Sequence, residues 1–499
     1  MKYDCIIIGA GVAGLASAIK LTSCGKKIIL LERQPIPGGL ATSFRRQGFT
    51  FESSLHCVNA LGEGGEVFSF LKEYGLDEKI KLIGLKSFSR IIYPEHDFSA
   101  DFSRENYLGF LKSKFPQESY GLDLFFKEVV KFSRQIDEFI CSSWPRWLRI
   151  TCVPFLYPEI LKASILTIDQ LISKYIKDDK LKAIVTDIWR FTGLAPTKLS
   201  AFYFLLVFRG YYFAPTAYVS GGFGQLFKAM VDKIKENGSL VKFNTDVVRI
   251  DIDKKSGLKT VVSAKKEEFS APVVISNANP IDTLTKLVND EGLRSKYSQS
   301  LGHLEKSISA FQVYLGLKVP AKDLGMDHHM FSINPSYNHD RNFDCSLRGD
   351  YENCPFGIVD HAQIDPGLVP QGRGNLLIMV LDSYANWAGL SAEEYKKKKI
   401  EVAKILIRRA EKFLPGLSGQ IDVMEVATPK TIERFGVSPQ GAIYGFAQTV
   451  KQASENRLPQ KTSIRGLILT GGWTWPGGGF HACLDSGKEA ARLALRLLK

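Results

Sequence analysis

Three glycines near the start of the chain have the spacing of a dinucleotide-binding turn. In "YDCIIIGAGVAGLASAIKLTSCGKKIILLERQ" they are Gly9, Gly11 and Gly14, and Glu32 follows eighteen residues after Gly14. In such a pattern the first glycine makes a tight turn, the second lets the backbone approach a pyrophosphate, and the third lets the helix pack against the strand. Glu32 is suited to accept a hydrogen bond from a ribose 2′-hydroxyl. The pattern therefore predicts a dinucleotide whose phosphates lie at a helix N-terminus.

A second glycine pair separates FAD from NAD, which share this fingerprint. The stretch "PIPGGLATSFRRQGFTFESSLH" places Gly38 and Gly39 where the backbone can run beside the rest of an extended dinucleotide. It resembles the flavoprotein pattern of the amine oxidase and phytoene desaturase superfamily, which binds FAD. The resemblance implies FAD as the cofactor and adds Arg33 and Leu40 to its expected contacts.

Further stretches resemble one branch of that superfamily, the phytoene desaturases, carotenoid isomerases and retinol saturases. They occur in the family's order, nearly end to end: "AYVSGGFGQLFKAM" (217–230), "DHHMF" (327–331), "DPGLVPQGRGNLLIMV" (365–380), "ATPKTIERF" (427–435), "GAIYG" (441–445) and "LILTGGWTWPGGGFHACLDSG" (467–487). There are two departures. Gly472 stands where many relatives carry an acidic residue or alanine, and "ESSLHCVNAL" replaces the common "DTGP" form and is closer to saturase-like members.

The resemblance implies an FAD-dependent oxidoreductase that acts on C–C or C=C bonds of a long apolar polyene, isoprenoid or other unsaturated lipid. Desaturation, cis/trans isomerisation and saturation share this scaffold, and the C-terminal pattern favours the isomerase and saturase-like members. Burial of such a substrate in a hydrophobic tunnel supplies roughly 0.8 kcal/mol per CH₂ group. Two alternatives on the same fold stay open: a flavin oxidase of amines or porphyrinogens, and a non-catalytic lipid-binding escort protein. The electron donor or acceptor is left open.

The C-terminal stretch "GGWTWPGGGFHACLDSG" combines five glycines and two tryptophans within nine residues. The resemblance places it against the flavin, with the backbone turning at Gly471 and Gly472 and passing the ring at Gly479. Phe480 and His481 then open the last helix. The free N–H groups of that helix are expected to stabilise negative charge on the reduced ring.

Four further side chains are candidates for the reaction or the substrate. His56 and His481 lie in segments that the family places beside the flavin, where a histidine can move a proton or orient the ring; a structural hydrogen bond is the alternative for both. Arg434 is a candidate for a polar substrate group, with an internal ion pair as the alternative. Tyr211 lies in "AFYFLLVFRGYYF" (201–213), which is either an aromatic tunnel wall or ordinary core.

These residues require a parallel sheet to position them. Tyr3–Ile8 and Lys27–Leu31 read as buried strands that flank the first glycine turn and its helix. Residues 238–280 alternate strands and turns, as in a β-meander that returns to the main sheet, and the resemblance places Val247 there against the adenine. An amphipathic pattern predicts a helix over 391–414 that packs on a core.

The predicted fold is α/β, a Rossmann-type FAD-binding domain in three sequence pieces with an inserted α+β substrate domain. The FAD-binding pieces are expected at 1–87, 215–300 and 425–499. The substrate-binding or cap domain is expected at 88–214 and 301–424, and its first part reads as helical and rich in aromatic residues.

Composition sets the remaining bounds. Of the 499 residues, 45% are hydrophobic and 23% charged, and 65 Lys+Arg against 52 Asp+Glu give a net charge of +13. A basic chain suits nucleic acid or an anionic membrane, but no zinc-finger or RNA-binding signature is present, so no nucleic-acid partner is expected. The eight cysteines are scattered without a CxxC pair, and the histidines of "DHHMF" and His339 have no recognised metal spacing. We expect no disulfide and no metal.

Membrane contact at the surface is a further expectation. The most apolar uncharged run, "LSAFYFLLVF" (199–208), is too short to span a bilayer. The stretch 142–166 mixes Trp144, Trp147 and other aromatics with cations, a composition that suits the membrane interface or, alternatively, the core of a cap domain. The expected location is cytoplasmic and peripheral on the membrane, and the oligomeric state is left open.

Overall fold

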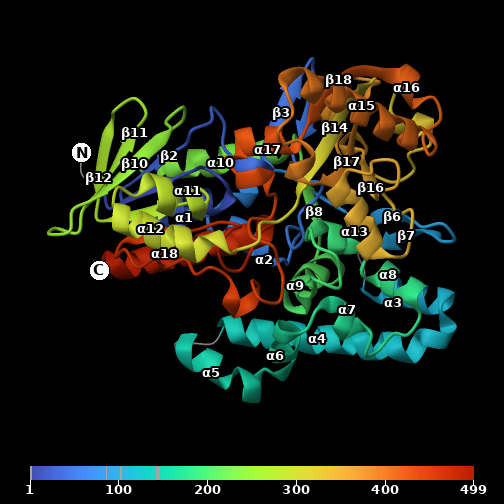
Figure 1. The fold of residues 1–499 in the computed structure, drawn as a ribbon, viewed down its shortest axis with the longest axis horizontal. Coiled ribbons are helices and arrows are strands. Elements are labelled where there is room, and N and C mark those ends of the chain that lie inside the picture. Colours follow the sequence, from blue (N-terminus) through green and yellow to red (C-terminus); the bar gives the residue numbers. More distant parts are fainter. Residues whose placement is uncertain (1–2, 86, 102–103, 142–145) are drawn as a thin grey trace.

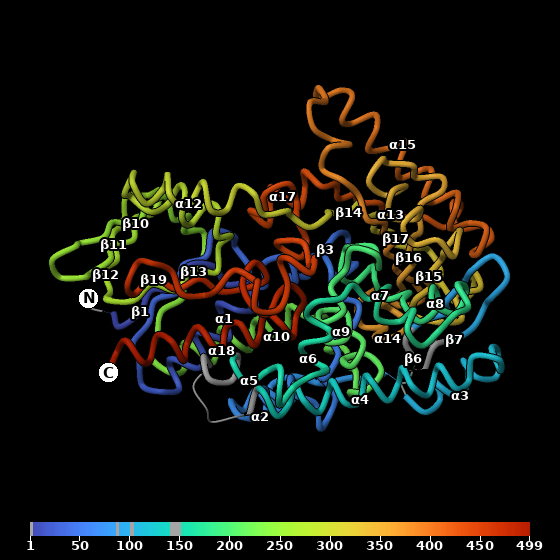
Figure 2. The backbone as a smooth tube through the Cα atoms, turned by 60° about the horizontal axis from the view of Figure 1, so that its bottom comes forward, coloured from blue at the N-terminus to red at the C-terminus, as the bar shows by residue number. Residues whose placement is uncertain are grey.

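A five-stranded parallel sheet forms the part of the molecule that contains both chain ends (Figures 1 and 2). The computed structural model describes residues 3–85, 87–101, 104–141 and 146–499. The strand order is β19–β13–β1–β2–β9, which joins three separate pieces of the chain. The strands are β1 (Cys5–Ile8), β2 (Ile28–Leu31), β9 (Leu240–Lys242), β13 (Val273–Ser276) and β19 (Leu467–Leu469). Their continuous apolar sequences fit a sheet that is covered on both faces.

Three helices and a small sheet cover this parallel sheet. The helices are α1 (Val12–Ser23), α10 (Phe223–Glu236) and α18 (Phe480–Leu497). Helices α1 and α18 approach closely because Gly487 has no side chain: a Cβ there would lie 2.3 Å from the Ala13 carbonyl oxygen. The predicted meander is confirmed as a three-stranded antiparallel sheet of β10 (Val247–Ile252), β11 (Lys259–Ser263) and β12 (Glu268–Ala271), followed by β13 in the main sheet.

A seven-stranded sheet forms the second large layer, in the order β18–β14–β17–β16–β15–β6–β7. Its strands are β6 (Ser87–Ile92), β7 (Asp97–Asp101), β14 (Ser309–Leu317), β15 (Met330–Ile333), β16 (Phe356–Val359), β17 (Gly374–Asp382) and β18 (Ile421–Ala427). Helix α15 (Ala392–Glu411) packs on it with Ala403, Leu406, Ile407 and Ala410 buried, which confirms the predicted amphipathic helix.

A layer of helices with a strongly aromatic core lies below this sheet in Figure 1. The helices are α3 (Arg104–Lys114), α4 (Ser119–Cys141), α5 (Arg146–Leu156), α6 (Pro158–Ile165), α7 (Ile168–Ile172), α8 (Asp179–Val185) and α9 (Ala201–Tyr212). The expectation that 88–214 is helical holds only from Arg104 onward. The β6–β7 hairpin precedes it and adds two strands to the seven-stranded sheet.

The remaining elements connect these layers. Two short sheets pair β3 (Ser43–Arg46) with β4 (Phe49–Glu52) and β5 (Leu82–Gly84) with β8 (Ala217–Val219). The other helices are α2 (Glu66–Glu73), α11 (Pro280–Asp282), α12 (Glu291–Gly302), α13 (His339–Arg348), α14 (His361–Ile364), α16 (Leu417–Gln420) and α17 (Pro429–Gly436). The predicted domain boundary at 425 falls inside β18.

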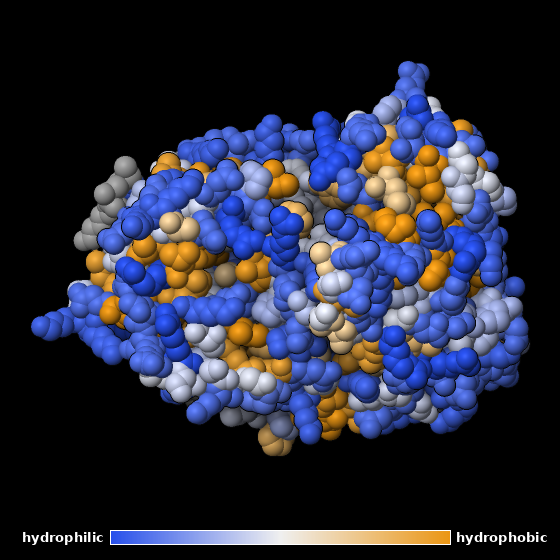
Figure 3. All heavy atoms as spheres, turned by 45° about the horizontal axis from the view of Figure 1, so that its top comes forward, coloured by the Kyte–Doolittle hydropathy of each residue, from blue (hydrophilic) through white to orange (hydrophobic). Residues whose placement is uncertain are grey.

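The surface is mixed in character. On the face in Figure 3, polar side chains predominate and apolar ones gather in separate patches. Within the described part of the chain, no helix has both the length and the apolar character that crossing a bilayer requires.

Candidate functional site

A cavity of about 1520 Å³ runs between the parallel sheet and the helical layer. At one end it is lined by the first glycine turn and Glu32, and at the other by helices α4, α6 and α9. Its walls come from nearly every part of the sequence and are mostly apolar. A drug-sized ligand needs about 300–1,000 Å³, so this cavity can hold an extended cofactor together with a further ligand.

The first glycine turn forms the floor of one end of the cavity. Gly9 and Gly11 line it, whereas Gly14 lies behind them. Gly14 allows close packing there, since a Cβ at Gly14 would lie 2.1 Å from the Gly9 carbonyl oxygen. Gly9 has φ +96°, which favours glycine. Helix α1 begins after Gly11 without a capping side chain and without an acidic residue in its first turn. Its first N–H groups are therefore available to an anion.

Glu32 stands at the carboxyl end of β2 and is buried. Its Oε2 accepts a hydrogen bond from the Ala10 N–H at 2.6 Å, and its Oε1 accepts one from the Gln34 N–H at 2.7 Å. Burial raises the pKa of Glu32, and these two hydrogen bonds act in the opposite direction. The carboxylate is thus fixed at the rim of the cavity, with lone pairs left for a hydroxyl donor.

The second glycine pair faces the first across the cavity wall. Gly38 and Gly11 form an isolated parallel bridge, and the Gly38 N–H donates to the Ala10 carbonyl at 2.9 Å. Gly39 and Leu40 line the cavity, as does Arg33, which also donates from its guanidinium to the Arg434 carbonyl at 2.6 Å. The two glycine turns are separated in the sequence but adjacent in space, and they therefore form one continuous backbone surface.

The C-terminal loop closes the middle of the cavity. Gly472, Gly479, Phe480 and His481 line it, and Gly471 lies just behind, where a Cβ would lie 2.5 Å from Asn277 Oδ1. Helix α18 begins after Gly479 with no capping side chain and no acidic residue in its first turn. Both helix N-termini at the cavity therefore lack internal caps.

His481 belongs to an ion-pair network at the cavity wall. Its Nε2 lies 2.9 Å from Glu66 Oε2 and 3.6 Å from Asp485 Oδ2. Burial lowers the pKa of His481, but the hydrogen bond to Glu66 and the charge of Asp485 outweigh burial and raise it. The hydrogen bond from His481 lowers the pKa of Glu66 to about 2. Glu66 also accepts from Arg209 on α9 at 2.9 Å, so the network joins α18 to the helical layer.

His56 lies in a drier part of the cavity wall, 6% exposed. Its Nε2 lies 3.1 Å from Met379 Sδ, and its Nδ1 has no partner among the described residues. Because a thioether sulfur only accepts, this contact places the proton on Nε2 and leaves a lone pair on Nδ1. Burial lowers the pKa of His56 to about 4, with a smaller contribution from His329, so the ring is neutral at pH 7.

Helix α9 has one face on the cavity and one in the core. Tyr211 lines the cavity together with Phe202, Tyr203, Leu206 and Val207. Its other face, Phe204, Leu205, Phe208 and Tyr212, is fully buried in the aromatic core. One face of this stretch therefore belongs to the core and the other lines the cavity, and a role of that second face in binding substrate stays a prediction. Tyr203 donates from its hydroxyl to the Gly478 carbonyl at 2.5 Å, which ties α9 to the C-terminal loop.

Of the two remaining predicted site residues, Val247 lines the cavity and Arg434 does not. Val247 lies in β10 and lines the cavity near Glu32. Arg434 is exposed, and it is not among the cavity-lining residues; its guanidinium lies over the Phe435 ring, 5.4 Å from the ring centroid. The structure therefore does not bring Arg434 to the cavity.

Asn277 and Arg457 are residues of the site that sequence reasoning missed. Asn277 follows β13, and Gly11 and Gly471 both approach its side chain so closely that neither could carry a Cβ. Its position after a central parallel strand was the available signal, because ligands bind at the carboxyl ends of such strands. Arg457 lies behind the loop at Gly472, and no local pattern marks it.

The cavity fits FAD. Two uncapped helix N-termini face it, one at each glycine-rich end. Glycines of both turns, Gly9, Gly11, Gly38 and Gly39, present backbone to the cavity, and the buried Glu32 carboxylate stands where a ribose is expected. The adenosine ribose, the pyrophosphate and the flavin ring of FAD match Glu32, the α1 N-terminus and the α18 N-terminus, respectively.

Comparisons with known proteins agree with this geometry. Residues 12–495 match the family "Flavin containing amine oxidoreductase". The chain is 27% identical to prolycopene isomerase 1, chloroplastic, of an Oncidium hybrid cultivar, covering 98% of this chain and 83% of the relative. It is 25% identical to the lycopene-forming phytoene desaturase of Pseudescherichia vulneris, covering 99% of each. It is 21% identical to the all-trans-retinol 13,14-reductase of Danio rerio, covering 94% and 82%.

Solved structures show the same fold. An oxidoreductase from Methanosarcina mazei superposes with a TM-score of 0.62 at 16% identity, covering 98% of this chain and 100% of that one. Cyclohexylamine oxidase from Brevibacterium oxydans superposes with a TM-score of 0.63 at 13% identity, covering 100% of both. The Rossmann-type fold, the FAD cofactor and an oxidoreductase activity are thereby established for this chain, which belongs to the flavin-containing amine oxidoreductase family.

Proposed function

We propose that this chain is an FAD-dependent enzyme that acts on the double bonds of a long apolar polyene or isoprenoid, as a desaturase, a cis/trans isomerase or a saturase. The observation that carries the proposal is the cavity, which continues past the flavin-binding surface into a long, mostly apolar space. The names of the relatives support it, because prolycopene, phytoene and retinol are all apolar polyenes or their precursors.

The apolar end of the cavity matches a lipid chain. Its walls there come from α4, α6 and α9, through Ile136, Phe139, Ile160, Leu161 and Leu206. A chain buried among such side chains gains roughly 0.8 kcal/mol for each CH₂ group removed from water. Length and apolar character of the substrate therefore supply its affinity.

The cofactor and the protein residues have different roles in the proposed reaction. When bound, FAD supplies oxidation and reduction at carbon. Backbone N–H groups of α1 and α18 hold its charged parts, and the aromatic face of α9 orients the substrate and excludes water. His56, neutral and carrying a free Nδ1 lone pair, is placed to accept the proton that a substrate carbon releases when the carbon next to it has given up a hydride. His481 is paired with Glu66, which raises the pKa of the imidazole against the effect of burial, and it is better placed to support the cofactor.

Incubation with defined substrates tests the proposal. The purified holoprotein, with its flavin either oxidised or chemically reduced, is mixed anaerobically with phytoene, prolycopene or all-trans-retinol, and the products are separated by chromatography and identified by mass spectrometry. A change of two hydrogens identifies a desaturase or saturase, and an isomer shift at constant mass identifies an isomerase. Turnover of putrescine, cyclohexylamine or a porphyrinogen without turnover of any polyene would instead establish the oxidase alternative. A protein that binds these lipids without FAD-dependent conversion would establish the escort alternative.

We also propose that the enzyme attaches to a membrane surface through α5 and α6. Phe155 is 85% exposed and Ile165 62%, and Leu156 is also exposed. Ile165 and its neighbour Leu161 line the cavity as well, so the exposed apolar surface adjoins the cavity mouth. A lipid substrate could then pass from the bilayer without crossing water. Trp144 lies outside the described residues, as does the side chain of Trp147. A cytoplasmic location stays a prediction.

Vesicle binding tests this attachment. A Phe155→Ser/Ile165→Ser variant should co-sediment with vesicles that contain anionic lipid several-fold less than the wild type, because it loses the apolar contact. Tyr120→Ser is the matched control, since Tyr120 is 77% exposed on α4 and away from the cavity. Equal binding of all three proteins would show that α5 and α6 do not dock on membranes.

A further inference from the structure

Arg457 is a buried arginine that bonds only to backbone carbonyl oxygens. It is 3% exposed. One terminal nitrogen donates to the Phe446 carbonyl at 2.6 Å, and the other donates to the carbonyls of Gly472 at 2.6 Å and Tyr444 at 3.2 Å. Its Nε has no partner among the described residues. The guanidinium thus joins two segments that are both part of the cavity wall.

The charge of Arg457 has no internal counter-charge in the described part of the chain. None of the ion pairs found there includes it, and the groups that act on it electrostatically are the neutral side chains of Tyr203 and Cys483. Burial lowers the pKa of Arg457 to about 10, which still leaves it charged at pH 7. Buried charges are normally paired, because an unpaired one loses its hydration without compensation. A permanent cation kept in this position indicates that a negative charge arrives from outside the polypeptide.

The position of Arg457 identifies where that negative charge arises. Gly472, Tyr444, Tyr203 and Cys483 all surround Arg457, and all four line the cavity. Gly472 opens the loop that leads to the uncapped N-terminus of α18. The guanidinium therefore lies directly behind the wall that faces the flavin, separated from it by the backbone at Gly472 and Tyr444. A flavin that takes up two electrons and one proton carries a negative charge on its ring.

We propose that Arg457 is an electrostatic positioning residue that stabilises the reduced, anionic flavin through the wall formed by Gly472 and Tyr444. It acts together with the α18 N-terminus, and both set the reduction potential of the cofactor. The proposal depends on flavin binding, which the family establishes, and not on the identity of the substrate. Failure of the polyene assays would leave it intact.

The two-electron reduction potential of the holoprotein tests this role. Removing the charge in Arg457→Met should lower the equilibrium constant for reduction at least tenfold, which for a two-electron couple is about 30 mV. Arg457→Lys keeps the charge but loses the fork that binds three carbonyls, so its potential should fall less than that of the methionine variant. If Arg457 has a purely structural role, both variants will lose stability and neither will change the reduction potential of the flavin.

Arg409 provides the matched control. It is a buried arginine on α15 that donates to the carbonyls of Tyr351 and Cys354 at 2.5 and 2.6 Å, in the layer of the seven-stranded sheet. Arg409→Met should lower the melting temperature and leave the flavin potential unchanged. An Arg457→Met potential equal to that of the wild type would overturn the proposal. If the methionine variant loses its flavin, the proposal is tested on the wild type instead. The reduced flavin of the wild type should stay anionic at a lower pH than free reduced flavin in the same buffer. A reduced flavin that becomes neutral at a higher pH than free flavin would overturn the proposal.

Discussion

At the scale of single residues, the glycines of the site serve two different physical needs. Gly14 and Gly471 allow close approach, since a Cβ on either would overlap a neighbouring atom. Gly479 has open space around it, but its φ of +96° and ψ of 157° belong to a region that only glycine adopts readily. A substitution at Gly14 or Gly471 is disfavoured by steric overlap, whereas a substitution at Gly479 is disfavoured by backbone strain. The strain at Gly479 can therefore be tested without disturbing the packing.

Gly479→Ala should weaken flavin binding before it weakens the fold. The backbone conformation costs about 1–3 kcal/mol for an L residue, and relief of that strain turns the first N–H groups of α18 away from the cofactor. We expect the flavin Kd, measured by fluorescence, to rise about tenfold or more. Gly416→Ala is the control, because Gly416 has φ +82° and open space but does not line the cavity. An unchanged flavin Kd together with a lower melting temperature would contradict this expectation.

His481→Gln should reduce stability in a pH-dependent way. Because the folded state raises the pKa of His481, its ion pair with Glu66 stabilises the protein fully below the pKa of the unfolded histidine, about 6.5. That contribution is lost as the pH rises through the raised folded value. The difference in melting temperature between wild type and variant should therefore be largest near pH 6 and shrink towards pH 9. A difference that grows with pH would show that Asp485, Arg209 and Lys488 dominate instead.

At the scale of elements, α9 shows how one helix serves the fold and the site at once. It is apolar apart from Arg209 and the tyrosine hydroxyls, and most of its side chains are buried. Its core face packs within the aromatic cluster, and its other face has the cavity in place of a neighbouring helix. In Figure 2, α9 lies near the middle of the molecule, next to α6. A single apolar stretch can therefore position the cofactor loop through Tyr203 and accommodate the substrate through its neighbours.

Substitutions on the two faces of α9 should separate these functions. Phe204→Ala removes a fully buried ring and should cost about 3–5 kcal/mol of unfolding free energy, measured with urea. Leu206→Trp fills part of the cavity and should leave the melting temperature within a few degrees while it raises the KM for a long substrate. If both variants lose stability equally and neither changes KM, the cavity face of α9 does not contact the substrate.

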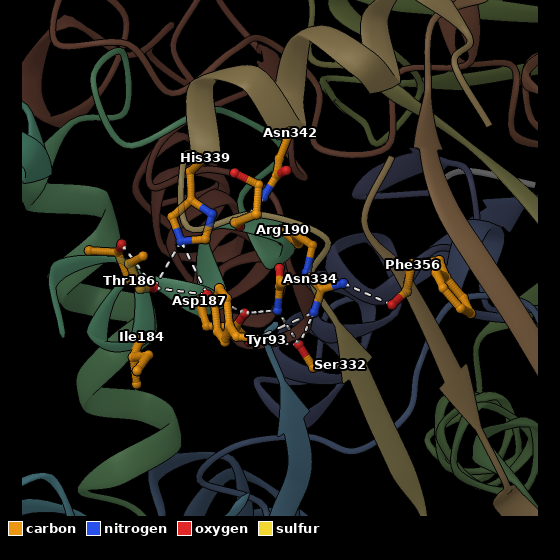
Figure 4. A network of polar contacts seen from close by, with 12 residues as sticks. Tyr93, Ile184, Thr186, Asp187, Arg190, Ser332, Asn334, His339, Asn342 and Phe356 are labelled. Atoms are coloured by element: carbon orange, nitrogen blue, oxygen red, sulfur yellow. Dashed lines mark hydrogen bonds and ion pairs between the residues drawn. The ribbon is translucent and has the colours of Figure 1, made fainter. Parts of the chain in front are cut away.

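At the scale of the whole molecule, a buried polar network joins the helical layer to the seven-stranded sheet. Figure 4 shows Tyr93, Ser332 and Asn334 around the carboxylate of Asp187, with Arg190 beside them. Asp187 accepts from Tyr93 at 3.1 Å, Ser332 at 2.8 Å and Asn334 at 2.7 Å. Arg190 lies 3.7 Å from it and donates to the Phe356 carbonyl at 3.1 Å. The network fixes the two layers that enclose the apolar end of the cavity.

Asp187→Ala should destabilise the molecule by about 3–5 kcal/mol, because it leaves the buried charge of Arg190 without its partner. The double variant Asp187→Leu/Arg190→Met removes both charges and should recover a large part of that loss. Urea unfolding followed by circular dichroism and by flavin fluorescence measures both effects. A double variant as unstable as the single one would show that the neutral hydrogen bonds, and not the charges, join the layers.

The amino-acid sequence by itself determined the cofactor and the elements that bind it. Local patterns suffice for the first glycine turn with its flanking strands and helix, for the meander and for the helix at 391–414, because each depends on neighbours a few residues apart. The contacts of Glu32 and Val247 with the cofactor stay predictions. The order of the motifs further implied a family that the whole-chain match confirms. The predicted domain limits remain predictions, and the β6–β7 hairpin was missed because a short strand pair gains its stability only from the distant strand β15 beside it.

Only the tertiary structure decided which side chains share the cavity. Arg434 lies in a matching motif but is exposed, whereas Asn277 lines the cavity without belonging to a motif, and Arg457, also outside any motif, lies directly behind the cavity wall. His56 acquires its neutral, unpaired nitrogen from burial against Met379, which lies 323 residues away in the sequence. Burial lowers the pKa of His481, and Glu66 on another helix more than offsets that effect. The protonation of a side chain and its access to the cavity depend on burial and on partners that are distant in the sequence. These are properties of the folded chain, and the spacing of residues does not predict them.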